Sequence, residues 1–292
     1  MKADKIGFIG VGVMGEPMCR NLAAKSGRPV IAFDRDPAPL ERLKAVGVEP
    51  AGSIPALART CDIIFLALAS GKHVETVCTD EEGLVVRARA GQIIVDLGTS
   101  PVDLTRSLAA KFREREARYA DAPIARTRQA AEEGTLSIMV GADAETFAEI
   151  QPLLACCATD ITHCGPVGSG QIVKILNNMV LAETVVALSE ALVVARRAGL
   201  NGAILFETLM KGSADSFALR NHGMKAVLPN IFPERAFSTD YMRKDIGYAL
   251  ELATSVGAKL HGAELASRLL QDASKAGFAD FYWPVVSRIV GA

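Results

Sequence analysis

The sequence contains a long apolar segment between Gly165 and Gly199. It begins with a Gly/Pro-rich loop, and Arg196 and Arg197 precede its closing glycine, as basic residues often do in the last turn of a helix. A single helix of roughly 30 residues would be about 45 Å long, which is more than most single domains require. We therefore expect a helix that serves two domains.

Three polar residues lie near the start of this helix. Lys174, Asn177 and Asn178 have i, i+3 and i+4 spacing, so they project from one side. Their neighbours are mostly apolar, which predicts a helix surrounded by protein. Burial disfavours the ammonium form and can bring the pKa of a lysine into the range useful for proton transfer. In the alternative interpretation, the amine of Lys174 reaches solvent and the asparagines bind backbone groups.

Composition limits the classes of protein to which this chain can belong. Its 292 residues suggest two domains, and its 50% hydrophobic content is enough for a large core. The formal net charge of -1 does not favour nucleic acid as a partner, and the basic stretch Lys111–Arg118 is mixed with glutamates. Four histidines and six cysteines show no metal-ligand spacing and no CxxC, so we expect no metal site and reduced thiols.

Neither a secretory signal nor a membrane span is expected. The N-terminus leads almost directly into an apolar strand pattern at Ile6–Ile9, without the regions of a signal peptide. Glu183 and Glu190 interrupt the long apolar segment, so we expect it to fall short of the roughly 18 residues that a spanning helix needs. These features predict a soluble cytoplasmic protein that contacts no membrane.

A glycine motif follows the first apolar run. Lys5–Ile9 has the pattern of a strand and Pro17–Ala24 that of a helix. Between them lies a GxGxxG motif, which consists of Gly10, Val11, Gly12, Val13, Met14 and Gly15. In this context the glycines of a dinucleotide fingerprint permit a tight turn, the approach of a pyrophosphate and close helix packing. A glycine turn without a ligand is the alternative.

The next apolar run indicates which dinucleotide binds. Pro29–Phe33 ends at Asp34, 19 residues after Gly15, where a carboxylate can accept hydrogen bonds from the adenosine ribose hydroxyls. Asp34 and Asp36 flank Arg35, so a 2'-phosphate would meet two carboxylates. NAD is therefore favoured, although Arg35 alone can hold that phosphate, which leaves NADP open.

Further strands and helices alternate along this part of the chain. Asp62–Ala69 and Gln92–Leu97 are near-continuous apolar runs, which are typical of parallel strands buried on both faces. The expected helices are Leu40–Val46, Ile54–Arg59, Val74–Cys78 and Val102–Glu116. A doubly wound sheet binds ligands beyond the carboxyl ends of its strands. The segments expected to bind ligands are then the two that follow these strands, Leu68-Ala69-Ser70 and Gly98-Thr99-Ser100-Pro101. In the alternative interpretation, both are ordinary turns.

A loop with two arginines follows. The segment Ala125-Arg126-Thr127 can present a guanidinium to an anionic substrate. Alternatively, Arg126 and Arg128 are surface charges. Their partners would then be Glu132 and Glu133, at helical spacing.

The pattern changes in the second part of the chain. A last strand is expected at Leu136–Val140, and after Gly165 only helices are expected, at Asn201–Lys211, Ser216–Leu228, Asp240–Val256, Ala263–Gly277 and Trp283–Ile289. We therefore place an α/β domain at residues 1–164 and an all-α domain at 165–292. Lys244 and Asp245 begin an amphipathic helix, either as an exposed charge cluster or as functional residues.

Five stretches of the chain together resemble the β-hydroxyacid dehydrogenase family, which includes 3-hydroxyisobutyrate dehydrogenase and tartronate semialdehyde reductase. They are GFIGVGVMGEPMCRNL (Gly7–Leu22), DLGTSP (Asp96–Pro101), DAP with GTLSIMVG (Asp121–Gly141), GPVGSGQIVKILNN (Gly165–Asn178) and RKDIGYALELA (Arg243–Ala253). They occur in the order of the family and cover nearly the whole chain.

The resemblance implies a Rossmann-like nucleotide domain, a long connecting helix and an all-helical domain used for homodimer or homotetramer contacts. It implies that Lys174 is the catalytic residue and that Asn178, with Asn177, binds the substrate. It also implies that Thr99 lies beside cofactor and substrate, and that Lys244 contacts the nicotinamide side. The expected cofactor-binding residues are then Gly10, Val11, Gly12, Val13, Met14, Gly15, Asp34, Arg35, Leu68, Ala69, Thr99 and Lys244.

Two departures from the family pattern concern the substrate. Where the family commonly has Ser-Gly-Gly, this chain has Ala125-Arg126-Thr127, which resembles the Gly-Arg-Thr of sulfolactaldehyde reductase, whose arginine recognises a sulfonate. Arg126 and Thr127 are therefore expected to bind the anionic group of the substrate. The loop of Thr99 and Ser100 also looks one residue shorter than in many relatives, which leaves the role of Ser100 open.

The expected activity is reversible hydride transfer between NAD(P) and a short anionic β-hydroxy acid or its semialdehyde. The substrate would be of the 3-hydroxyisobutyrate, tartronate semialdehyde or sulfolactaldehyde type, and Lys174 would donate the proton during reduction. One alternative is a reductase of imines or bulkier aldehydes, in which Arg126 lies on the surface. The other is a non-catalytic nucleotide-binding regulator of the same fold.

Overall fold

The structure, a computed structural model, describes residues 5–234 and 236–291. The chain forms two compact units, of which the first ends at Lys174 and the second begins at Ile175. The first unit is an α/β sheet structure, and the described residues of the second form helices with two isolated β-bridges. The expected class of fold, an α/β domain followed by a long helix and an all-α domain, is confirmed.

A nine-stranded sheet forms the centre of the first unit. Its strands are β1 (Ile6–Ile9), β2 (Val30–Phe33), β3 (Glu49–Pro50), β4 (Ile63–Leu66), β5 (Ile93–Asp96), β6 (Arg118–Asp121), β7 (Ile124–Ala125), β8 (Leu136–Gly141) and β9 (Ala158–Gly165). Their order is β3-β2-β1-β4-β5-β6-β8-β7, with β9 paired to β8. The first six strands are parallel, whereas β8 runs antiparallel to β6 and β7. The carboxyl ends of β1, β4, β5 and β6 therefore lie at one edge, where sheets of this kind bind ligands.

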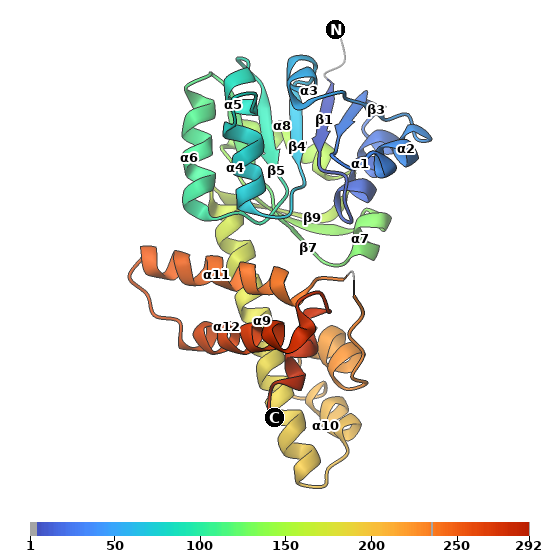
Figure 1. Cartoon of the computed structure of the whole chain (residues 1–292), viewed down its shortest axis with the longest axis vertical. Helices are drawn as coiled ribbons and strands as arrows, with labels where there is room; N and C mark the ends of the chain where they lie inside the picture. The colour runs from blue at the N-terminus through green and yellow to red at the C-terminus, as the bar shows by residue number, and fades with distance from the viewer. Residues whose placement is uncertain (1–4, 235, 292) are drawn as a thin grey trace. The chain divides into compact units, whose positions relative to one another are not determined.

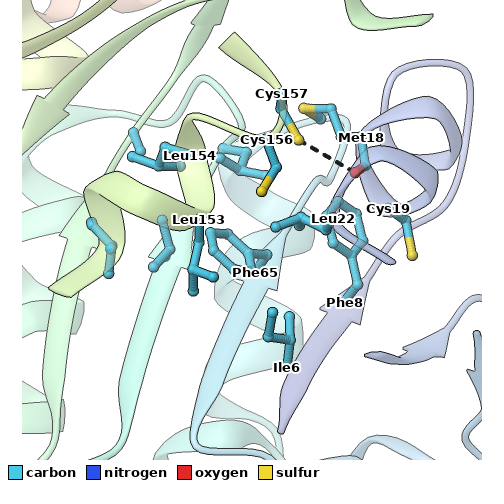
Figure 2. Close-up of a cluster of buried hydrophobic side chains, with 14 of the residues drawn as sticks. Ile6, Phe8, Met18, Cys19, Leu22, Phe65, Leu153, Leu154, Cys156 and Cys157 are labelled. Atoms are coloured by element: carbon cyan, nitrogen blue, oxygen red, sulfur yellow. Dashed lines mark hydrogen bonds between the residues drawn. The ribbon is translucent and has the colours of Figure 1, made fainter. Parts of the chain in front are cut away.

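Helices cover both faces of the sheet, as a doubly wound fold requires (Figure 1). One face packs against α1 (Gly15–Lys25), α2 (Pro37–Lys44), α7 (Arg128–Glu133) and α8 (Ala144–Leu154). The other packs against α3 (Ile54–Thr60), α4 (Gly71–Thr79), α5 (Leu84–Arg87) and α6 (Val102–Arg113). Figure 2 shows the first of these cores, in which the rings of Phe8 and Phe65 are 6.2 Å apart and the Cys157 thiol donates to the Met18 carbonyl oxygen.

The long helix is α9 (Ser169–Arg197), which has 29 residues and lies inside the predicted segment. It is followed by α10 (Gly202–Leu209), the π-helix η1 (Leu219–Val227), α11 (Thr239–Ser255), α12 (His261–Ala273), the π-helical turn η2 (Ser274–Phe278) and the 3-10 helix η3 (Trp283–Arg288). The helix expected at 216–228 is present, and its central part is π-helical. Its buried residues are Leu219, His222, Gly223, Ala226 and Val227, a spacing that an α-helix also shows, so the sequence pattern does not distinguish the two kinds of helix.

The expectation that the apolar segment is too short to span a membrane was wrong. In the described part of the chain, α9 is long and apolar enough to do so by length and composition alone. The core helix of a soluble protein gives the same signal. In the second unit, Val185, Leu188 and Leu192 of α9 are buried in a core with Phe206 and Trp283, which accounts for the apolar composition.

Candidate active site

A glycine turn follows β1. Gly10 has a φ of 93°, and a Cβ placed on it would lie 2.5 Å from the carbonyl oxygen of Ala67, just beyond β4. A Cβ on Gly15 would overlap the Gly10 carbonyl, so α1 packs directly on the turn. Gly12 and the neighbouring Val13 are exposed, and no atom lies within 4 Å of where a Cβ on Gly12 would be. Open space at this backbone position is what the approach of a pyrophosphate requires.

Asp34 connects the end of β2 to this turn. Its Oδ2 accepts a hydrogen bond of 2.7 Å from the Val11 amide, and its Oδ1 accepts one of 2.9 Å from the Asp36 amide. Asp36 caps α2, and Arg35 is exposed. Met14 is the N-cap residue of α1, and among the described residues no side chain caps this end of the helix. An uncapped helix N-terminus beside an acidic residue at the end of β2 fits a dinucleotide.

The loops after β4 and β5 lie against each other. A Cβ on Gly98 would come within 2.9 Å of the Leu68 carbonyl oxygen, so the two segments that the sequence indicated are adjacent. Leu68 is half-buried and Ala69 is exposed. Thr99 is largely buried, with 6% of its surface exposed.

Asp96 is a fully buried carboxylate at the end of β5. It accepts hydrogen bonds from the Gly98 amide at 2.9 Å and from the Ser100 hydroxyl at 2.7 Å, with the Tyr119 hydroxyl at 3.4 Å. Ser100, whose role the sequence left open, therefore holds its own loop to β5. Burial raises the pKa of Asp96 to about 7, because removal from water disfavours the carboxylate.

Asp121 is the neighbour of Asp96 in the register of β5 and β6. Its Oδ1 accepts a hydrogen bond of 2.6 Å from the Gly168 amide, and its Oδ2 accepts one of 2.8 Å from the Gln171 amide. Burial raises the pKa of Asp121 to about 6, although these backbone donors favour the charged form. No role was predicted from the sequence for Asp96 or Asp121. The feature that could have identified them is their position as the first residues of the DLGTSP and DAP stretches.

Arg126 lies between β7 and α7 and has a φ of 85°. Its guanidinium donates hydrogen bonds to the Thr135 carbonyl oxygen at 2.6 Å, to Thr159 Oγ1 at 3.0 Å and to Asp160 Oδ2 at 2.6 Å. Thr135 immediately precedes β8, and Thr159 and Asp160 belong to β9. The side chain is partly exposed, and its carboxylate partner is Asp160.

The residues after Arg126 belong to α7. Arg128 pairs with Glu132 at 2.9 Å, as expected if it is a surface charge. The same interpretation was wrong about Arg126, whose partner is Asp160 and not a glutamate of α7. The hydroxyl of Thr127 accepts a hydrogen bond of 3.4 Å from the Ala130 amide and caps the helix.

Lys174, Asn177 and Asn178 lie on α9, but they differ in exposure. Lys174 is half-buried, Asn177 is exposed, and Asn178 has 1% of its surface exposed. In the second unit, Asn177 Nδ2 donates to Asn178 Oδ1 at 3.1 Å, and Asn178 Nδ2 donates to Asp245 Oδ2 at 2.7 Å. These bonds fix the orientation of the Asn178 amide.

Lys244 and Asp245 form a pair on α11. Lys244 Nζ lies 3.1 Å from Asp245 Oδ1 and 3.9 Å from the ring centroid of Tyr241. Asp245 has 1% of its surface exposed, so the interpretation of this pair as an exposed charge cluster was wrong. The missed signal was helical spacing, because Asp245 is on the buried face of α11 with Met242 and Ile246.

The predicted site residues thus form separate groups. In the first unit, the glycine turn, the loops after β4 and β5 and the start of α9 meet at the carboxyl ends of parallel strands. In the second unit, Asn177, Asn178 and Lys244 are connected through Asp245. Among residues 5–234 and 236–291, no group of three or more His, Cys, Asp or Glu side chains could hold a metal ion.

Known proteins match both parts of the chain. Residues 5–165 match the family model of the NAD binding domain of 6-phosphogluconate dehydrogenase, and residues 168–281 match the model described as NAD-binding of NADP-dependent 3-hydroxyisobutyrate dehydrogenase. The 2-(hydroxymethyl)glutarate dehydrogenase of Eubacterium barkeri is 36% identical over 270 residues, which cover 92% of this chain and 89% of that protein. The chain belongs to the β-hydroxyacid dehydrogenase family.

Two further matches support the assignment of this chain to the β-hydroxyacid dehydrogenase family. The NAD-dependent L-serine dehydrogenase of Pseudomonas aeruginosa is 31% identical over 98% of this chain and 97% of its own length. The structure of Mycobacterium tuberculosis 3-hydroxyisobutyrate dehydrogenase with L-serine has a TM-score of 0.91 and 30% identity, and covers 100% of both chains. The predicted family and the enzyme class, an NAD(P)-dependent dehydrogenase in a family of soluble enzymes, are confirmed.

Burial of Asp96 predicts that the stability of this dehydrogenase decreases as the pH rises. Folding raises the pKa of Asp96 from 3.8 to about 7, so the folded state binds more protons between these values. The stabilisation is complete below the lower pKa and is lost as the pH rises through the higher one. We expect the free energy of unfolding in urea to fall by about 2–3 kcal/mol between about pH 5 and about pH 8.

The variant Asp96→Asn should reduce this dependence, because the amide cannot titrate, while Asp121, whose pKa burial raises to about 6, keeps the part of the slope that lies below that pH. Asp103→Asn, at an exposed position on α6, is the matched control and should keep the slope of the wild type. An unchanged slope in Asp96→Asn would assign the pH dependence to other groups.

Proposed function

We propose that this dehydrogenase interconverts a short anionic β-hydroxy acid and the corresponding semialdehyde, with NAD as its cofactor. The main support is the adjacency, within the first unit, of the glycine turn, the Thr99 loop and the start of the helix that carries Lys174. Relatives named for 2-(hydroxymethyl)glutarate, L-serine and 3-hydroxyisobutyrate point to the same class of substrate. The candidates are 3-hydroxyisobutyrate, tartronate semialdehyde and sulfolactaldehyde.

When bound, the nicotinamide cofactor supplies or accepts the hydride. The glycine turn and the N-terminus of α1 would bind its pyrophosphate, and Asp34 its adenosine ribose. The other proposed contacts are Val11, Val13, Met14, Arg35, Leu68, Ala69, Thr99 and Lys244. Because Asp34 and Asp36 disfavour a 2'-phosphate, we expect a higher kcat/KM with NAD than with NADP, and the reverse order would assign the phosphate to Arg35.

The chain's own residues provide proton transfer and orientation. Lys174 donates a proton to the carbonyl oxygen during reduction and accepts it back during oxidation, which typically contributes about 10²- to 10⁴-fold. Asn178 orients the substrate hydroxyl through an amide that Asp245 already holds, and Asn177 lies beside it. Thr99 contacts both substrate and cofactor.

Arg126 and Thr127 would bind the anionic group of the substrate. That anion competes with Asp160, whose ion pair with Arg126 is exposed, and solvent screening makes such pairs weak. A planar carboxylate or a sulfonate that accepts two charge-assisted bonds can therefore replace Asp160. On this basis we include a sulfonate substrate of the sulfolactaldehyde type in the proposal.

One observation favours a second activity, the reduction of imines or bulkier aldehydes. The guanidinium of Arg126 already has three protein partners, so it can serve the structure alone. The substrate would then need no anionic group. A non-catalytic regulator is not supported, because the chain belongs to a family of dehydrogenases and has Lys174 together with both asparagines.

We also propose a cytoplasmic location and a homodimer or homotetramer. All six cysteines are free and five are buried, as is usual in a reducing compartment. On α9, Val180 and Val194 are 57% and 67% exposed, which suits packing against a second copy of the chain. Sedimentation velocity measures the oligomeric state, and a monomer at working concentrations would contradict the proposal.

Replacement of Lys174 tests the proposed chemistry. Lys174→Ala removes the proton donor, so kcat should fall by about 10²- to 10⁴-fold while the Kd for NADH changes little. Lys111→Ala, at an exposed position on α6, is the control and should leave kcat unchanged. Steady-state rates and NADH fluorescence titrations measure both quantities. Near-normal turnover of Lys174→Ala would remove this residue from the mechanism.

Two opposite changes test the role of Arg126. Arg126→Ala should raise KM for hydroxy acids by about 10- to 100-fold, the cost of a lost charge-assisted contact. Asp160→Asn should lower KM by at most a few-fold, because it removes the competing carboxylate from a weak pair. Arg128→Ala, which breaks only the pair with Glu132, should leave KM unchanged. A normal KM in Arg126→Ala would support the imine or aldehyde alternative.

A further inference from the structure

The side chain of Gln171 is fully buried and binds the loop after β5 with both ends of its amide. Nε2 donates a hydrogen bond of 2.8 Å to the Gly98 carbonyl oxygen, and Oε1 accepts one of 3.0 Å from the Ser100 amide. Thr99 lies between these two contacts. The backbone of the Thr99 loop is therefore held on both sides by a residue of α9.

The first turn of α9 is itself fixed to the sheet. Asp121 binds the amides of Gly168 and Gln171, as described above. A Cβ on Gly170 would overlap the Met139 carbonyl oxygen of β8 and come within 2.9 Å of Asp121 Oδ2, so helix and strand approach as closely as two backbones can. A shift of this turn would break several of these contacts at once.

The loop is also held by β5, the strand that precedes it. Asp96 binds the Gly98 amide and the Ser100 hydroxyl, while Gln171 binds the Gly98 carbonyl oxygen and the Ser100 amide. Gly98 and Ser100 are thus each bound by both side chains. Lys174 follows Gln171 by three residues, which places both on one side of the helix.

We propose that Gln171 is a positioning residue, which sets the place of Thr99 relative to the amine of Lys174. The proposal rests on the roles proposed for Lys174 and Thr99. A displacement of about 1 Å between reacting groups can cost about 10²-fold in rate, whereas the glycine turn and Asp34 do not depend on this amide. Gln171 therefore acts on turnover and not on cofactor binding.

The variant Gln171→Met tests this proposal, because methionine has a similar length and makes neither hydrogen bond. We expect kcat to fall by about 10- to 100-fold while the Kd for NADH stays within about threefold of the wild type. The matched control is Gln92→Met. Gln92 has 2% of its surface exposed, and its Nε2 donates to the carbonyl oxygens of Ala58 and Cys61 near the opposite end of β5. Gln92→Met should lose thermal stability and keep its kcat.

A double variant separates positioning from general destabilisation. If Gln171 acts through Thr99, the losses of kcat in Gln171→Met and Thr99→Ala should not add in the double variant. If Gln171→Met does not fold, Gln171→Glu keeps the acceptor for Ser100, loses the donor to Gly98, and should still lower kcat. Wild-type kcat in the soluble variant, equal losses in Gln171→Met and Gln92→Met, or additive losses with Thr99→Ala would overturn the proposal.

The result for Lys174→Ala distinguishes this proposal from the proposed function. An inactive Lys174→Ala together with a fully active Gln171→Met would overturn only the positioning role. An active Lys174→Ala would overturn the proposed function, whatever the outcome for Gln171.

Discussion

The arrangement of the first unit's site depends on the hydrogen bonds between Asp121 and the first turn of α9. A buried carboxylate is costly unless donors surround it, and the first amides of a helix lack partners within the helix. The amides of Gly168 and Gln171 donate hydrogen bonds to the Asp121 carboxylate, so the buried carboxylate gains donors and the helix amides gain an acceptor. The helix N-terminus also favours negative charge. The start of α9, and with it Lys174, is thereby positioned by the end of β6.

The strands that could be predicted from sequence are those buried on both faces. β4 and β5 consist almost wholly of apolar residues because helices cover them on both sides. A continuous apolar run in the sequence therefore indicates a strand that is buried on both faces. β9 was not predicted, because half of its residues are polar and exposed and its place is fixed by pairing with β8. β3 and β7 have two residues each, which is too few to show any periodicity.

Some features of the candidate site could be predicted from the sequence and others could not. The glycine turn and Asp34 were predictable, because a dinucleotide needs particular residue types at particular distances along the chain. The pair of Arg126 and Asp160 was not, because 34 residues separate its members. They become neighbours because Ala125 of β7 and Asp160 of β9 both pair with Ser137 of β8. The register of three strands, which local pattern does not contain, decides which carboxylate the arginine meets.

The backbone at Arg126 adds a physical reason to give this residue a function. Its φ of 85° is a conformation that glycine adopts freely and that costs other residues on the order of 1–3 kcal/mol. The chain thus places a long cation on a glycine-like backbone. Bonds to Thr135, Thr159 and Asp160 offset the strain. In the proposed function an anion replaces Asp160 while the bonds to the Thr135 carbonyl oxygen and Thr159 Oγ1 remain, so the same side chain can hold its loop and bind the substrate.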